Sequence, residues 1–143
     1  MNREEQYIRL AESEVLCTAN ECQLKQACLR WILRDYIPAE RLYVKALNPR
    51  HHWSEGNECT AFRSAQTSML ARGFKHLYDN MQLSKVLTVS KKLQSLFTPT
   101  GYYRLKRGDR PLTTAERRRI EEVCREAGVT EPVAFDTWEE GIE

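Results

Sequence analysis

The segment from Thr113 to Gly128 constrains the fold most tightly, because its start, its end and its buried side can all be identified from the residues. Thr113 and Glu116 have the separation of a capping box, in which each side chain accepts a hydrogen bond from the other residue's backbone. Gly128 suits the left-handed conformation that ends many helices. Apolar residues recur between them at helical spacing, at Ile120, Val123, Cys124 and Ala127. The sequence therefore predicts an amphipathic helix here.

The same periodicity predicts helices over most of the chain. We expect them at residues 3–16, 22–36, 64–80, 84–97 and 102–107. Ser84 is expected to cap the fourth of these helices, and Gly108 to end the fifth. Residues 42–47 are expected to be extended or a minor strand, and residues 48–58 to form a loop. The pattern as a whole predicts a mainly α fold.

A chain of 143 residues with 41% hydrophobic content can bury one ordinary core. We expect a single compact helical domain made of a Cys-rich helical lobe, a basic helical lobe with a helix-turn-helix-like segment, and an acidic tail. Their boundaries are residues 1–62, 63–129 and 130–143. The predicted helix at 64–80 is expected to join the two lobes.

No apolar run approaches the roughly 20 residues that a membrane-spanning helix needs. The first ten residues, MNREEQYIRL, are charged and lack the apolar centre of a secretory signal. We therefore expect a cytoplasmic protein with no membrane partner.

The charge is distributed very unevenly along the chain. Residues 61–120 contain 13 Lys and Arg against 3 Asp and Glu, whereas residues 121–143 contain 1 against 8. Such a basic region favours a negatively charged partner. DNA, another nucleic acid, an acidic protein or the acidic tail itself would fit, and a merely solvated helix face is the alternative.

One basic stretch carries a more specific resemblance. The residues FTPTGYYRLKRG, followed by a proline-containing turn and the capped helix, resemble the turn and recognition helix of repressor-type helix-turn-helix proteins over residues 97–128. This resemblance implies that Phe97, Tyr102 and Leu105 are buried. It implies that the major groove of DNA or its phosphates are contacted by Thr98, Thr100, Gly101, Tyr103, Arg104 and Arg107.

The side-chain chemistry suggests a role for each of these residues. Arg104 and Arg107 would contact bases or phosphates, while Lys106 and Arg110 would contact phosphates. Tyr103 would stack on a base or contact phosphate. The sequence thus predicts a DNA-binding protein that is not an enzyme. An interaction or structural domain whose basic face binds an acidic partner is the alternative.

The chain has five cysteines, an odd number, and it is expected to remain in a reducing compartment. Both points argue against a disulfide framework. Four of them, Cys17, Cys22, Cys28 and Cys59, could supply the sulfur ligands of a tetrahedral metal site. Structural zinc is the expected metal, an iron–sulfur cluster is the alternative, and small buried side chains without a metal are the third interpretation. Cys124, on the capped helix, is expected to lie in the core.

A cysteine-dependent enzyme is a further alternative. Cys59 could pair with His51 or His52, which lie in the preceding loop, and either histidine could also replace a cysteine at the metal site. No third residue that would orient the pair can be identified locally.

Several motifs together resemble one family. They are the CxxxxCxxxxxCLRW segment, the NP-containing loop that ends at Cys59, the ARGFKHLYDNM segment and TGYYRLKRGDRPLT. Over residues 17–136 they resemble an uncharacterised protein family of Bacteroidetes-type bacteria, a domain of unknown function. The resemblance implies a bacterial cytoplasmic setting and transfers no site residue.

Overall fold

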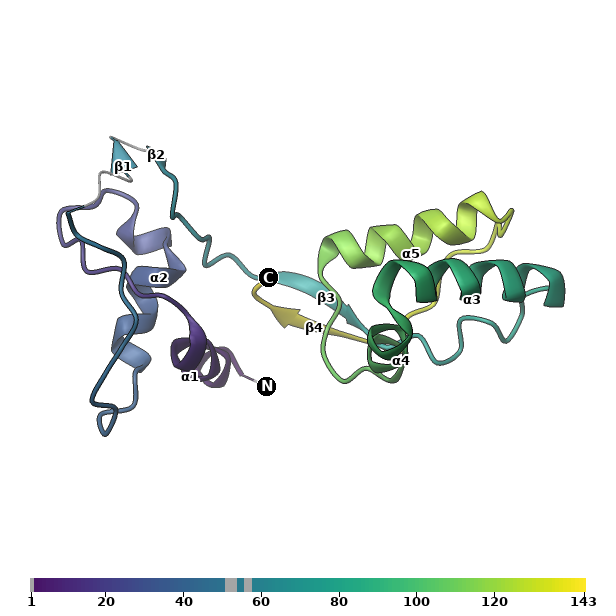
Figure 1. Cartoon of the computed structure of the whole chain (residues 1–143), viewed down its shortest axis with the longest axis horizontal. Coiled ribbons are helices and arrows are strands. Elements are labelled where there is room, and N and C mark those ends of the chain that lie inside the picture. The colour runs from purple at the N-terminus through teal and green to yellow at the C-terminus, as the bar shows by residue number, and fades with distance from the viewer. Residues whose placement is uncertain (1, 51–53, 56–57) are drawn as a thin grey trace. The chain divides into compact units, whose positions relative to one another are not determined.

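The computed structural model describes residues 2–50, 54–55 and 58–143, which form two compact units (Figure 1). Unit 1 contains Met1–Thr67 together with Ile142, and unit 2 contains Ser68–Gly141 together with Glu143. Each unit combines helices with a two-stranded antiparallel sheet. The fold is therefore mixed α/β, and the prediction of a mainly α protein is wrong. Within the described residues, no helix is both long and apolar enough to cross a bilayer.

Unit 1 begins with one regular helix and continues with short ones. Helix α1, Arg3–Ser13, starts at a capping box in which Asn2 and Glu5 bond reciprocally. The predicted helix at 22–36 is instead three short pieces, η1 (Lys25–Ala27), α2 (Leu29–Ile32) and η2 (Leu33–Tyr36). It breaks at Cys28, whose extended backbone pairs with Ser64 in an isolated bridge. The core of unit 1 is formed by Tyr7, Ala11, Leu16, Leu29, Leu33 and Ala65.

In the segment predicted to be extended or a minor strand, 42–47, the structure has one isolated parallel bridge, between Ala46 and Leu16. The Leu16 N–H donates to the carbonyl of Lys45 (2.9 Å), and the Leu47 N–H donates to the carbonyl of Leu16 (2.8 Å). Strands β1 (Ser54–Glu55) and β2 (Glu58–Cys59) then form a small antiparallel pair within the predicted loop. These contacts anchor Leu16, which precedes Cys17, and Cys59 itself.

Unit 2 places three helices over an antiparallel ribbon. Strands β3 (Ser68–Arg72) and β4 (Thr137–Gly141) pair along their whole lengths. The three helices are α3 (Leu83–Phe97), α4 (Pro99–Arg107) and α5 (Thr114–Glu126). Their shared core includes the fully buried Phe74, Val89, Leu93 and Ile120, with Tyr102 and Leu105 contributed by α4.

The prediction of a helix at 64–80 is also wrong, because β3 occupies its centre. Leu70 and Ala71 are adjacent and both buried, and β3 pairs with β4 more than sixty residues later in the chain. Gly73 ends the strand with a φ of 72°, a conformation that a helix interior does not allow. Long-range pairing therefore overrides the local helical spacing of the apolar residues.

The other helices of unit 2 agree closely with the prediction. Helix α5 has the predicted capping box, and Gly128 has the predicted positive φ of 83°. Helix α3 starts one residue before the predicted cap, after Gln82, whose side chain makes no capping hydrogen bond. Helix α4 starts three residues before the predicted Tyr102, because Thr98 caps it and Pro99 suits its first turn.

Candidate nucleic-acid interface and cysteine pocket

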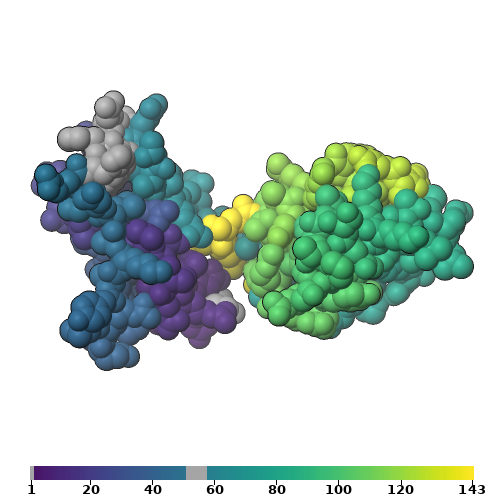
Figure 2. Space-filling view, in the orientation of Figure 1, coloured from purple at the N-terminus to yellow at the C-terminus, as the bar shows by residue number. Residues whose placement is uncertain are grey.

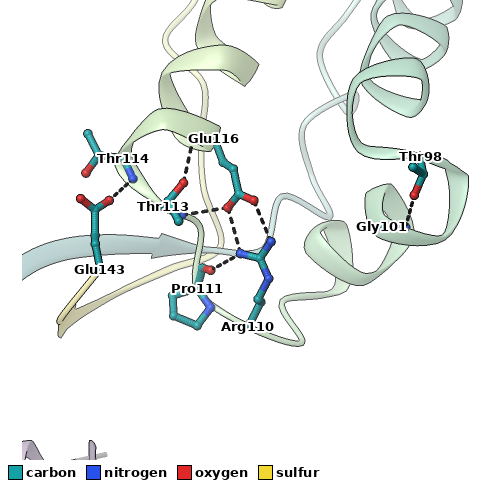
Figure 3. Close-up of polar contacts among 8 residues, drawn as sticks. All are labelled: Thr98, Gly101, Arg110, Pro111, Thr113, Thr114, Glu116 and Glu143. Carbon is teal, nitrogen blue, oxygen red and sulfur yellow. Dashed lines mark hydrogen bonds and ion pairs between the residues drawn. The ribbon is translucent and has the colours of Figure 1, made fainter. Parts of the chain in front are cut away.

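Helix α4, which carries most of the predicted DNA contacts, is attached to α3 through a single residue, Thr98. The Thr98 side chain accepts a hydrogen bond from the N–H of Gly101 (3.2 Å), which caps α4 (Figure 3). Thr98 has φ 62° and ψ 153°, a region of backbone conformation that is nearly restricted to glycine. The Thr98 hydroxyl, predicted to contact phosphate, therefore holds a strained corner between two helices.

The opposite end of α4 is fixed by backbone contacts. Gly108 adopts the left-handed conformation (φ 82°) that ends the helix, as predicted. The N–H of Phe74 donates to the carbonyl of Lys106 (3.1 Å), which ties the last turn of α4 to the segment after β3. The Tyr102 and Tyr78 hydroxyls lie 2.7 Å apart, and burial raises the pKa of Tyr78. Helix α4 is therefore held at both ends and along its buried side.

The exposed side of α4 is formed by predicted contact residues. Tyr102 and Leu105 are 2% and 3% exposed, so they belong to the core as expected. Thr100, Tyr103, Arg104 and Arg107 are exposed, and their spacing of three, four and seven residues places them on one side of a helix. These four residues are called the α4 face below. In Figure 2 the green surface around α4 forms part of the visible side of unit 2.

Arg107 of the α4 face and two further predicted cations, Lys106 and Arg110, have partners inside unit 2. Arg107 forms an ion pair with Asp109 (2.9 Å), which lowers the pKa of Asp109. Lys106 is half-buried, with its ammonium 5.2 Å from the centre of the Tyr78 ring. Arg110 makes two hydrogen bonds to Glu116, of 2.7 and 2.9 Å (Figure 3). Lys106 and Arg110 therefore lie beside the α4 face with structural contacts of their own.

The Arg110 contact also supports the start of α5. Glu116 accepts from the Thr113 N–H (2.9 Å), and Thr113 accepts from the Glu116 N–H (3.1 Å) (Figure 3). The hydrogen bonds from Arg110 are the largest cause of the lowered pKa of Glu116. Arg110 thus stabilises the carboxylate that caps α5.

The acidic end of the chain contacts β3 and the start of α5. Strand β4 pairs with β3, and Glu139 makes two hydrogen bonds to Arg72 (2.8 and 3.2 Å). The carboxylate of Glu143 accepts from the backbone N–H of Thr114 at the start of α5 (Figure 3). Because Tyr103 remains 49% exposed and Arg104 and Arg107 are exposed, the tail leaves these three side chains accessible.

The arginine run on α5 has a different environment from the α4 face. Arg117 pairs with Glu121 and Arg119 pairs with Glu122, both at 2.8 Å. These pairs place positive and negative charges side by side on the same helix.

The four predicted cysteine ligands line one pocket in unit 1. Cys17 and Cys28 are 5% and 8% exposed, and Cys22 and Cys59 are half-buried. The cavity between them has a volume of about 10 Å³, close to the space that one water molecule fills. Cys124 is buried in the core of unit 2, as predicted, and burial raises the pKa of its thiol.

Backbone contacts bring these cysteines together from separate segments. The Cys17 N–H donates to the carbonyl of Arg30 (3.0 Å), and the Cys22 N–H donates to that of Ala19 (3.2 Å). Cys28 lies at the break between η1 and α2, and Cys59 ends β2. Burial raises the pKa of Cys17, while a hydrogen bond from the backbone of Ala19 opposes that shift.

All five cysteines are free thiols. In the part of the chain that the structure describes, no group of three or more His, Cys, Asp or Glu side chains already has a metal-coordinating arrangement. Sequence reasoning missed Lys25, Arg30 and Trp31, which also line the pocket. Their proximity to Cys22 and Cys28 in the sequence was the available signal. His51 and His52, the predicted partners of Cys59 in an enzyme, lie outside the described residues.

Comparison with known proteins places the whole chain in one family. Residues 1–143 match a family described as "Family of unknown function (DUF6078)". Neither a curated protein nor a solved structure matches the chain. The chain therefore belongs to the DUF6078 family, which covers its full length.

Proposed function

We propose that unit 2 binds duplex DNA through the α4 face. The observation that carries this proposal is the alignment of Thr100, Tyr103, Arg104 and Arg107 on the exposed side of one helix, while the acidic tail pairs with β3 and the start of α5. No acidic residue occurs within α4, whose sequence is PTGYYRLKR. A phosphate backbone approaching this helix would meet Arg104, neutral hydrogen-bonding groups and Arg107, whose partner Asp109 lies just outside the helix.

The dimensions and chemistry of the α4 face support the proposal. An α-helix with its side chains is about 10–12 Å wide, which fits the major groove of about 12 Å. An arginine can donate two hydrogen bonds to guanine or bind a phosphate, and a tyrosine can stack or donate its hydroxyl. Arg104 and Tyr103 therefore have the chemistry for direct contacts.

Lys106 and Arg110 would add positive charge at the rim of this surface. The ammonium of Lys106 lies at the C-terminal end of α4, and Arg110 follows three residues after that helix ends. Their existing contacts to Tyr78 and Glu116 hold these side chains in place. They would strengthen phosphate binding without reading sequence.

A specific observation also favours a second candidate, an acidic protein partner. Arg107 on the α4 face and Arg110 next to it already bind carboxylates of this chain, Asp109 and Glu116 respectively. A glutamate-rich or aspartate-rich peptide could make the same contacts from outside. DNA, unlike an acidic peptide, has aromatic bases on which Tyr103 could stack.

The test is a salt titration of binding to a fluorescently labelled duplex of mixed sequence, measured by anisotropy with the full-length chain. If DNA binds, log K should fall linearly with log salt, with a slope of about −0.9 for each phosphate contact. Arg104→Ala should reduce the magnitude of this slope by about 1 if Arg104 contacts phosphate. The double variant Arg104→Ala/Arg107→Ala should weaken binding further.

Arg125→Ala is the matched control. Arg125 is exposed in the last turn of α5, so this substitution removes one positive charge outside the α4 face. Its effect on the slope should be smaller than that of Arg104→Ala. Absence of duplex binding at low salt would contradict the proposal. Equal losses in Arg125→Ala and Arg104→Ala would show non-specific charge attraction instead. Tighter binding to polyglutamate than to DNA would favour the acidic partner.

A further inference from the structure

The four cysteines of unit 1 converge although the chain offers no short paired motif to bring them together. Cys17, Cys22 and Cys28 come from the loop after α1 and the start of α2, whereas Cys59 follows 31 residues after Cys28. All four nevertheless line the same small cavity. The fifth cysteine, Cys124, lies in the core of the other unit. Four thiols therefore lie together in unit 1, and the fifth lies alone in unit 2.

Unit 1 has little regular structure around this cavity. Beyond the 11 residues of α1, its described helices and strands contain two to four residues each. Small units with modest cores commonly gain their stability from a disulfide or a structural metal. The four free thiols of unit 1 have the chemistry of metal ligands.

The surroundings of the cavity suit an anionic metal–thiolate centre. A zinc ion bound by four thiolates has a net charge of −2, since four thiols release their protons to the solvent and the ion contributes +2. Lys25 and Arg30 both line the pocket, and the charge of Arg30 is partly offset by its ion pair with Glu14. Hydrogen bonds hold both side chains, from Lys25 to the Asn20 carbonyl (2.9 Å) and from Arg30 to Glu14 (2.7 Å).

We propose that Cys17, Cys22, Cys28 and Cys59 bind one structural zinc ion in unit 1. Four sulfur ligands match the tetrahedral preference of zinc, and a cavity of about 10 Å³ suits a single atom rather than an organic ligand. The thiols have to move closer together to coordinate the ion, since the described side chains do not yet have that arrangement. Zinc would thereby fix the loops around η1 and β2 to one another.

The test uses the full-length chain purified under reducing, oxygen-free conditions, with its metal content measured by mass spectrometry. We expect about one zinc per chain. After the zinc is removed and replaced by Co²⁺, the absorption spectrum should show thiolate-to-cobalt charge transfer and the visible bands of tetrahedral cobalt. This spectrum is read on the wild-type chain, so it does not depend on whether any variant folds.

Cys22→Ala and Cys59→Ala then identify the ligands, because both side chains are half-buried and their loss disturbs the core least. Each should weaken metal binding by more than about 100-fold, since even outer-shell changes cost roughly 10- to 100-fold. Cys124→Ala, in unit 2, is the control and should leave the metal content and the cobalt spectrum unchanged.

Three results would overturn the proposal. In the first, the reduced chain retains no zinc and gives no thiolate–cobalt absorption. In the second, both Cys22→Ala and Cys59→Ala bind metal as the wild type does. In the third, the chain contains iron and sulfide and has the absorption of an iron–sulfur cluster. The first would leave a pocket of reduced thiols without a metal. The second would place the metal elsewhere, and the third would replace zinc with a cluster.

Discussion

The two units of this chain are stabilised in different ways. Unit 2 packs α3, α4 and α5, with 15, 9 and 13 residues, over a continuous apolar core. Unit 1 has a smaller core and relies on polar contacts between short segments, such as Glu14 with Arg30 and Arg63. The difference suggests that unit 2 is stabilised mainly by apolar burial and helix caps, and unit 1 by cross-links between loops.

The largest expected effect concerns the core of unit 2. Leu93 is fully buried in α3, so Leu93→Ala should remove apolar contacts and leave a cavity, destabilising unit 2 by about 2–5 kcal/mol. Hydrogen exchange should show the loss in α3, α4 and α5 and not in α2 of unit 1. Equal loss of protection in α2 would mean that the two units unfold together and would break the comparison.

A smaller effect is expected at the ion-pair cluster of unit 1. The Glu14 side chain is 11% exposed, accepts a charged hydrogen bond from Arg30 (2.7 Å) and forms a second ion pair with Arg63. Glu14→Ala should cost about 1.5–3 kcal/mol, the range for hydrogen bonds to charged groups. Urea unfolding monitored by exchange in α1 and α2 measures this change. Arg119→Ala, which breaks an exposed ion pair on α5, is the reference. If Glu14→Ala lowers the free energy of unfolding by less than Arg119→Ala does, apolar packing dominates unit 1 as well.

The smallest effect concerns the pH dependence of unit 2. Arg110 and the α5 cap hold the pKa of Glu116 below its ordinary value of 4.5. The stability from this carboxylate is therefore fully present above about pH 4.5 and is lost as the pH falls through the lower folded-state pKa. Because Arg110 is largely exposed, the loss should be about 1 kcal/mol or less.

Thermal unfolding of unit 2 between pH 6 and pH 3, compared between wild type and Glu116→Gln, isolates the contribution of the Glu116 carboxylate to stability. The variant should be less stable at pH 6 and should show a shallower decline toward pH 3, since it cannot lose the charge. Parallel curves for the two proteins would assign the pH dependence to other carboxylates, such as Glu139 beside Arg72.

Local signals were sufficient for the helices of unit 2 and insufficient for its strands. Thr113, Glu116 and Gly128 specify α5 within 16 residues, so neighbouring residues contain the information. Strands β3 and β4 pair residues that are far apart in the sequence, and five residues of β3 provide too short a pattern to separate strand from helix. This long-range pairing turned the predicted helix at 64–80 into a strand.

The candidate sites were predictable in their residue types and only partly in their surroundings. The exposed positions of Tyr103, Arg104 and Arg107 follow from helical spacing once Tyr102 and Leu105 are assigned to the core. The Arg107–Asp109 pair and the strained corner at Thr98 depend on side-chain and backbone geometry that spacing does not specify. Likewise, the convergence of Cys59 with the earlier cysteines depends on the path of the loops.

The central claim, that the α4 face binds DNA, is tested most directly by NMR of the full-length chain titrated with a short duplex at low salt. We predict that the largest changes in amide chemical shift fall in residues 98–107 and that they diminish as salt is added. The amide shifts of the last turn of α5, around Arg125, should change little. Changes confined to unit 1 or to the end of α5, or the absence of salt-dependent changes in α4, would contradict the claim.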